Sequence, residues 1–258
     1  MLIKHIACVL LLAISVSAQT ADLAAILTRS GEKLSSLAEE FANVTCTETV
    51  TQFKLDKGGK ELQKADSEFD YLLSISADAH AIALEESRLP HNLHGQPQPK
   101  LMSSNGFATL FLVLHPYYQS SYEFTLDGIV PAQGTTVAHV GFRAIPGRRM
   151  PSMLFLRGKE YPLELAGTIT VDVKTGDVLR VQAAPANPLQ DIGIRDLQLD
   201  VEYAPVPLRG QAGQFRFASA ASVELATEKQ RWRNVHRFSH YQQFSVETDE
   251  VVKTPETK

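Results

Sequence analysis

The sequence has little cysteine and no apolar run long enough to span a membrane. Two of the 258 residues are cysteines, and Cys8 lies in a predicted leader, which excludes an intramolecular disulfide framework. A transmembrane helix needs about 20 apolar residues, and the run from Ile6 to Val16 is shorter. The net charge is −4 and basic residues cluster only in short groups. We therefore expect a protein that is not integral to a membrane and does not bind nucleic acid.

The motifs of common enzyme classes are also missing. The serine-hydrolase pattern G-x-S-x-G does not occur, and neither does a Walker A loop or the dinucleotide-binding pattern G-x-G-x-x-G. The sequence therefore predicts no catalytic residues and no cofactor. An enzyme without a recognisable motif remains as a third functional hypothesis.

Histidine and cysteine offer only partial sites. His91 and His94 form an H-x-x-H pair, and His236 and His240 are predicted to share one face of a strand. A tetrahedral zinc site needs four ligands. Neither histidine pair has two further candidate ligands nearby in sequence, so no metal site is predicted. Cys46 is interpreted as a half-buried structural thiol, because a neighbouring acid raises the pKa of a thiol.

The first eighteen residues have the pattern of an export signal. A short start with Lys4 precedes the apolar run, and Val16-Ser17-Ala18 supplies small residues for cleavage before Gln19. The mature protein is then expected in a periplasm or outside the cell. The full sequence is 44% apolar, which is typical of a folded protein. We predict one domain over 19–247 and a disordered tail over 248–258.

The periodicity of apolar residues changes early in the mature chain. Between 22 and 43 they recur every three or four positions, which predicts an amphipathic helix. Period-two alternation follows, with Thr45 to Thr51 on one face and Cys46, Glu48 and Val50 on the other. A Lys57–Lys60 turn joins this strand to a second one. The stretch 78–104 contains three prolines among polar residues and is predicted to be a long irregular connection.

The segment 106–114 is the most unusual. It reads GFATLFLVL, follows the capping candidates Ser103, Ser104 and Asn105, and stops at His115-Pro116. We predict a short helix that is apolar on all sides and therefore buried inside the fold.

Over the rest of the chain, apolar and polar residues alternate with the period of two that predicts β-strands. The clearest case places Leu197, Leu199, Val201 and Tyr203 on one face, opposite the acidic residues Asp196, Asp200 and Glu202. A turn is predicted at Pro205-Val206-Pro207, and the last strand is expected to pass through Phe238 and Phe244. Together the patterns predict an α+β fold: a strongly curved antiparallel sheet, an open half-barrel of about nine or ten strands, packed around the N-terminal helix and the apolar inner helix.

The order of these elements resembles the LolA/LolB-like periplasmic lipoprotein-carrier half-barrels. The most recognisable piece runs from Gly167 to Arg180, GTITVDVKTGDVLR, which is similar to a hairpin found in that group. The resemblance covers most of the mature chain. It implies an open barrel partly closed by helices, with an apolar hollow for acyl chains, and it assigns no individual site residues.

Three functions remain open after this reading. The first is a non-enzymatic carrier or binding protein for a lipid or an acylated polypeptide, with Phe107, Leu110, Phe111 and Leu114 lining the apolar hollow. In the second, the same residues fill the hollow as core and the protein is a cell-envelope interaction or sensor domain, with the acidic row Asp196, Asp200 and Glu202 as its surface. The third is the hydrolase without a motif.

Overall fold

The fold is an open half-barrel built on one large antiparallel sheet. The structure is a computed structural model, and it describes residues 3–40, 43–77, 82–90, 106, 108–132, 134–156, 159–208 and 211–243, with the side chains of the first helix described from Asp22. Ten strands form the sheet in the order β3-β2-β1-β12-β11-β10-β9-β8-β5-β4. They are β1 Asn43–Leu55, β2 Glu61–Ala77, β3 Ile82–Pro90, β4 Tyr122–Ala132, β5 Thr135–Ala144, β8 Leu165–Asp172, β9 Val178–Pro185, β10 Ile194–Leu208, β11 Gln211–Thr227 and β12 Arg231–Gln243. The predicted fold class is confirmed.

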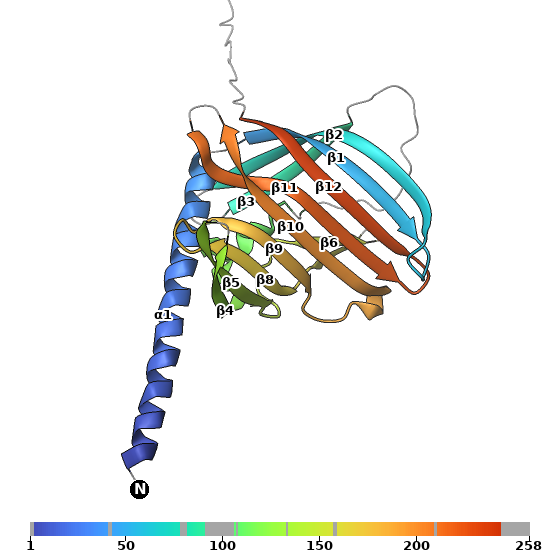
Figure 1. Ribbon diagram of the computed structural model, residues 1–258. Helices are drawn as coiled ribbons and strands as arrows, with labels where there is room; N and C mark the ends of the chain where they lie inside the picture. The colour runs from blue at the N-terminus through green and yellow to red at the C-terminus, as the bar shows by residue number, and fades with distance from the viewer. Residues whose placement is uncertain are drawn as a thin grey trace, which may run out of the picture.

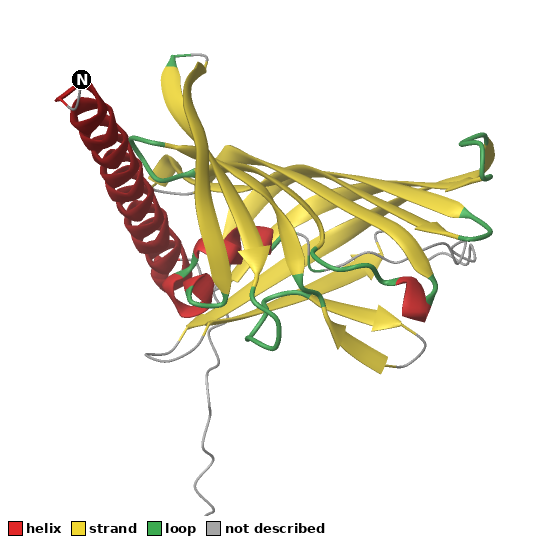
Figure 2. Ribbon diagram, turned by 90° about the horizontal axis from the view of Figure 1, so that it is seen from below, coloured by secondary structure: helices red, strands yellow, loops and turns green. Residues whose placement is uncertain are grey.

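The sheet curves around its buried face, and the helices lie to one side of it (Figure 1). The helical elements are α1 Ile3–Glu40, α2 Pro116–Gln119 and the 3-10 turns η1 Leu110–Leu114 and η2 Gln190–Ile192. Figure 2 shows η1 and α2 close to the C-terminal end of α1, and a small hairpin apart from the main sheet. This hairpin pairs β6 Met153–Leu156 with β7 Lys159–Pro162.

Period-two alternation sorts the strands into an inner and an outer face. On β1, Val44, Cys46, Glu48 and Val50 are buried, whereas the threonines between them are half-buried or exposed. On β10, Leu197, Leu199, Val201 and Tyr203 are buried as predicted. Such alternation is typical of a sheet with one face on the core and one in water. We call the buried side the inner face.

Helix α1 differs from its prediction at both ends. It starts at Ile3 and stops at Glu40, and the predicted last residue, Asn43, instead begins β1. The β-branched residues that follow Asn43 favour a strand over a further helical turn. The predicted apolar stripe is found towards the C-terminal end of the helix, where Leu34 and Leu37 are buried. A Cβ at Gly31 would stand 3.1 Å from the ring of Pro116, so this glycine lets α1 pack closely against α2.

The predicted irregular connection over 78–104 is wrong in part, because β3 occupies Ile82–Pro90 and pairs with β2 in continuous register. The alternation of β3 is hard to see in the sequence, since its inward positions include Glu86 and Arg88 as well as Leu84. His91 and His94 lie outside the described residues.

The predicted turn at Pro205–Pro207 is also wrong, because these residues continue β10. Strand β9 pairs with β10 only from Leu199 to Glu202, so both prolines lie where β10 has one described neighbour, β11. A proline nitrogen carries no hydrogen to donate, and the ladder irregularity at Val206 and Pro207 falls there. Along the same chain β12 ends at Gln243, and Phe244 and the predicted tail lie outside the described residues.

The predicted helix over 106–114 is shorter and tighter than expected. Only Leu110–Leu114 is helical, as the 3-10 turn η1. The Thr109 hydroxyl donates to the carbonyl of Gly106, which replaces a helical backbone bond with a local one. The turn ends where His115 becomes extended before Pro116. The prediction that the segment is buried is confirmed for all five residues of η1.

None of the described helices is long and apolar enough to cross a bilayer.

Candidate functional site

The apolar turn η1 lies between α1 and the inner face of the sheet. Leu110, Phe111 and Leu114 are at most 3% exposed, so three of the four predicted hollow residues meet in one cluster. Phe107 lies outside the described residues. Phe111 makes an edge-to-face contact with Tyr203 of β10, with ring centroids 5.6 Å apart. We call Leu110–Leu114 the plug, since these residues fill the space that the sheet encloses.

The described residues leave a small cavity beside the plug. It has a volume of about 20 Å³ and lies between Phe111, Leu34 of α1 and the side chains of Val178, Tyr203 and Phe215. That volume accommodates about one water molecule, so an acyl chain does not fit in this cavity while the plug and α1 stay in place. A larger groove of about 450 Å³ between α1 and α2 is lined mainly by polar side chains, including Glu32, Ser35, Ser36 and Glu39, and does not suit an acyl chain.

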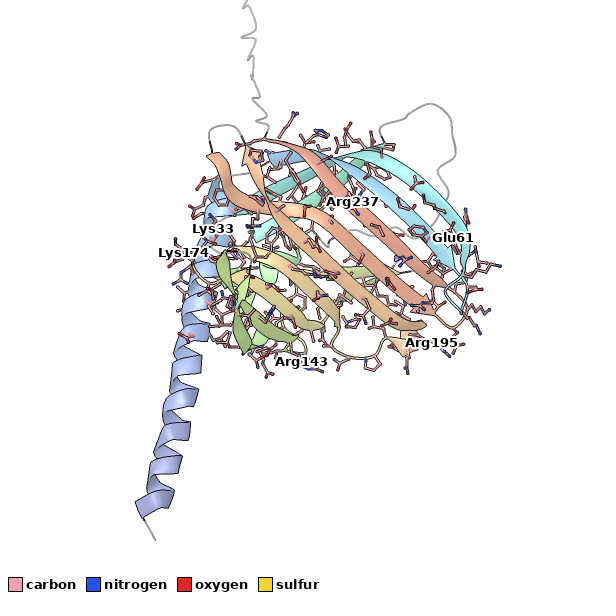
Figure 3. All side chains as sticks on the ribbon, viewed as in Figure 1. Lys33, Glu61, Arg143, Lys174, Arg195 and Arg237 are labelled. Carbon is pink, nitrogen blue, oxygen red and sulfur yellow. The ribbon has the colours of Figure 1, made fainter. Side chains whose placement is uncertain are left out.

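Polar contacts hold α1 over the turn that joins β8 and β9. Arg29 donates to the carbonyl of Val173, and Lys33 lies 3.9 Å from Asp177 and 4.5 Å from the centre of the Phe215 ring. Figure 3 places Lys33 and Lys174 together at this junction. The side chains of Lys33 and Asp177 are only 25% and 17% exposed. These contacts add to the buried apolar packing of Leu34 and Leu37 in holding α1 against the sheet.

One side chain links the plug to α1. The amide nitrogen of Gln119 donates to the carbonyls of Leu27 in α1, at 3.0 Å, and Leu114 in the plug, at 2.7 Å. Leu114 is the last residue of η1, so the amide supplies a partner for a carbonyl at a helix end. A displacement of α1 is therefore transmitted to the plug.

A second cluster, which is polar, lies on the inner face of β1, β3 and β12. The side chain of Glu48 is 0% exposed and that of His236 is 2% exposed. Arg88 donates to Glu48 from both Nε and Nη2, the latter at 2.8 Å from Oε1. Nδ1 of His236 lies 2.8 Å from the same Oε1. Two donors thus converge on one buried carboxylate, which is the arrangement that makes a buried charge tolerable.

The charges in this cluster follow from burial and pairing. Burial alone would raise the pKa of Glu48, but the hydrogen bonds from Arg88 and His236 outweigh it, and the pKa falls below its ordinary value. Burial lowers the pKa of His236, although Glu48 opposes this. The cluster therefore contains an ionised Glu48, a protonated Arg88 and a neutral His236 that donates from Nδ1.

The structure corrects two interpretations of single residues. Cys46 is fully rather than half buried, and burial raises the pKa of its thiol to about 12, so it is unreactive as a thiolate. His236 and His240 do not share a strand face. The register of β12 against β1 shifts between Thr45 and Thr47, and His240 there has a φ of +55°, so His240 is exposed while His236 is buried. Within the described part of the chain, no group of three or more potential ligands is placed to hold a metal ion.

The predicted acidic row is only partly free. Asp196 and Glu202 are exposed, but Asp200 accepts from Nε of Arg180 at 2.8 Å. The sequence therefore located the plug and this row but missed the polar cluster. The one sign of the polar cluster in the sequence was Glu48, a charged residue between Cys46 and Val50 on the inward side of β1.

Acid should destabilise the protein through His236. Because its pKa in the folded state lies below the ordinary value of 6.5, the unfolded chain binds a proton first as the pH falls, and stability is lost below about pH 6.5. We expect the free energy of unfolding, measured in urea, to fall between pH 7 and pH 5, and to fall less in His236→Gln, which keeps a donor for Glu48. The variant His139→Gln, on β5 beside Thr170, should keep the wild-type slope. Equal slopes in all three proteins would contradict the assignment.

Comparison with known proteins gives structural likeness only. No family model and no curated protein matches the chain. Among solved structures, the chain is similar to a DUF1329 family protein from Desulfovibrio piger, with 12% identity over 92% of this chain and 95% of that chain and a TM-score of 0.43. It is also similar to a LolA superfamily protein from Nitrosomonas europaea, with 9% identity over 79% of this chain and 87% of that chain and a TM-score of 0.33.

Proposed function

We propose that this protein is an exported, non-enzymatic carrier that holds a lipid or an acylated polypeptide in the hollow of its half-barrel. The buried plug is the observation that supports this proposal. Five consecutive apolar side chains of a short 3-10 turn are buried against the inner face, in the space that an acyl chain would take. The leader over 1–18 would deliver the protein to a periplasm or the cell exterior, where such a carrier works.

Replacement of the plug by a guest molecule is favoured when the guest has a long alkyl chain. Each buried methylene contributes about 0.8 kcal/mol, so a chain of about fourteen carbons gains roughly 10 kcal/mol before costs. The guest loses freedom on binding and must displace the plug from Tyr203 and Leu34. Gln119 bonds to both α1 and the plug, so entry of the guest would couple a movement of the plug to one of α1.

The small cavity favours a second candidate function. Beside Phe111 the described residues leave only about 20 Å³, and a cell-envelope interaction domain that binds no lipid would have such a filled interior. Asp196 and Glu202 would then be the first surface residues to test.

Mass spectrometry separates the two functions. We expect an organic-solvent extract of the protein, purified without detergent from a host that exports it, to contain about one lipid per chain. Phe111→Asp should abolish the lipid, while Leu62→Asp, an exposed site on β2, should retain it, with circular dichroism confirming that both variants fold. Absence of lipid, together with no stabilisation by added fatty acids or lipopeptides, would reject the carrier in favour of the interaction domain.

A further inference from the structure

The short helix α2 connects the plug, α1 and the first residue of β3. The side-chain amide of Gln119 donates to the carbonyls of Leu27 in α1 and Leu114 in the plug. The hydroxyl of Tyr118 donates to the carbonyl of Ile82 on β3 at 3.4 Å. Figure 2 shows the plug and α2 beside the C-terminal end of α1. A helix of one turn is not stable alone, so these connections depend on the residues that fix its ends.

His115 fixes the start of α2 and joins it to the plug. Its backbone nitrogen donates to the carbonyl of Leu112 in the plug at 2.9 Å. Its carbonyl accepts from the backbone nitrogens of Tyr118 and Gln119 at 2.8 and 3.1 Å. Its side chain is the N-cap, because Nδ1 accepts from the backbone nitrogen of Tyr117 at 3.2 Å. That nitrogen is one of the donors for which a helix has no internal partner, so the ring of His115 satisfies it.

This cap requires the neutral form of the His115 ring. A backbone nitrogen always donates, so Nδ1 must offer a lone pair and the hydrogen of the neutral ring lies on Nε2. An added proton goes to Nδ1, where it would point at the backbone hydrogen of Tyr117. The imidazolium ion has two donors and no acceptor, so rotation of the ring does not restore the bond. Proton uptake by His115 and capping of α2 therefore exclude each other.

The surroundings of His115 favour the neutral ring near pH 7. Its side chain is half-buried, and burial lowers its pKa below the ordinary value of 6.5. The titratable and charged groups on the elements around it are Glu32 and Glu39 of α1, which line a groove with Pro116, Tyr117 and Tyr118 of α2, Arg149 over the Tyr117 ring, and Tyr122 of β4. The two carboxylates favour a cation and Arg149 opposes it. A released α2 exposes the ring to water, so below about pH 6.5 proton binding favours the released state.

We propose that His115 is an acid-operated release for the plug: protonation of its ring uncaps α2 and frees the plug and α1 from each other. The inference goes beyond the proposed carrier function and does not depend on it, because the release needs no guest. In a carrier, the release would make exchange of the guest faster in an acidic environment. In an interaction domain, it would make the plug a sensor of acid.

Amide hydrogen exchange on the full-length protein tests this release. Exchange rates corrected for the intrinsic effect of pH give the opening equilibrium of each segment. We expect the protection of residues 110–119 to fall about tenfold between pH 7.5 and pH 5, the effect of losing one helix cap. His115→Asn keeps a capping oxygen that does not titrate, so its protection should equal that of the wild type at pH 7.5 under both conditions. His115→Ala has no cap and should show the lower protection at both pH values.

Two other histidines provide the controls, with circular dichroism checking that each variant is folded. His240→Gln changes an exposed histidine on β12 and should keep the wild-type response to acid. His236→Gln should keep it too, which separates release of the plug from the loss of global stability expected at Glu48. Protection of the plug that does not change with pH in the wild type would overturn the proposal. An acid response that persists in His115→Asn, or that disappears in His236→Gln, would overturn it as well.

Discussion

Replacement of Glu48 with leucine is expected to lower the free energy of unfolding by about 3–5 kcal/mol, the usual cost of removing one partner from a buried ion pair. Glu48→Leu leaves the guanidinium of Arg88 and the ring of His236 without the carboxylate that now accepts from both. Arg88 is only 15% exposed, so water replaces that partner poorly. Urea denaturation at pH 7 measures the loss.

The double variant Glu48→Leu with Arg88→Met tests whether the loss comes from the stranded charge. Two apolar residues of similar volume remove both charges, and stability should recover to near the wild-type value. A single variant within about 1 kcal/mol of the wild type, in the range of an exposed pair, would mean that the cluster is open to water.

Gly167→Ala is expected to be the most damaging small substitution, with a loss of about 3 kcal/mol or more. Gly167 lies on β8, opposite Ala183 of β9 and Phe142 of β5. A Cβ at this position would collide with the backbone of Gln182 and stand 2.8 Å from Cα of Ala183. Backbone atoms in the middle of a sheet cannot move aside without breaking the ladder. Thermal and urea unfolding measure the effect.

Gly141→Ala provides the control on the neighbouring strand. The added methyl there meets the side chains of Thr125 and Asp127, the latter at 2.9 Å, and these rotate away. We expect a loss of less than half that of Gly167→Ala. If the two variants lose the same stability, then close contact between β8 and β9 is not the reason for the glycine.

Much of the fold was predictable because apolar alternation reflects the inner face directly. On β10, the buried set from Leu197 to Tyr203 matches the pattern in the sequence, and the plug was visible as an unbroken apolar segment. The length and pitch of the plug were not predictable, because the bond from Thr109 to Gly106 and the extended His115 depend on local geometry. Pro205 and Pro207 suggested a turn because the sequence does not reveal where β9 stops pairing.

The polar cluster was missed for a related reason. Glu86 and Arg88 occupy inward positions of β3, where a predicted strand would have apolar residues. The alternation that predicts a strand is therefore missing from β3. Their partners are distant in sequence: Glu48 is 40 residues from Arg88 and 188 from His236. Side chains that break a local pattern are expected where function opposes simple packing.

The order of strands has a consequence for self-association. The sheet does not close on itself, and β3 and β4 occupy its two ends. Unpaired ends of this kind recruit strands from other copies and lead to polymerisation. Here β3 finishes at Pro90, which cannot donate a bond, and β4 carries a bulge between Leu126 and Gly128 and a proline at Pro131. These features protect the two ends of an open sheet from pairing with other copies of the chain.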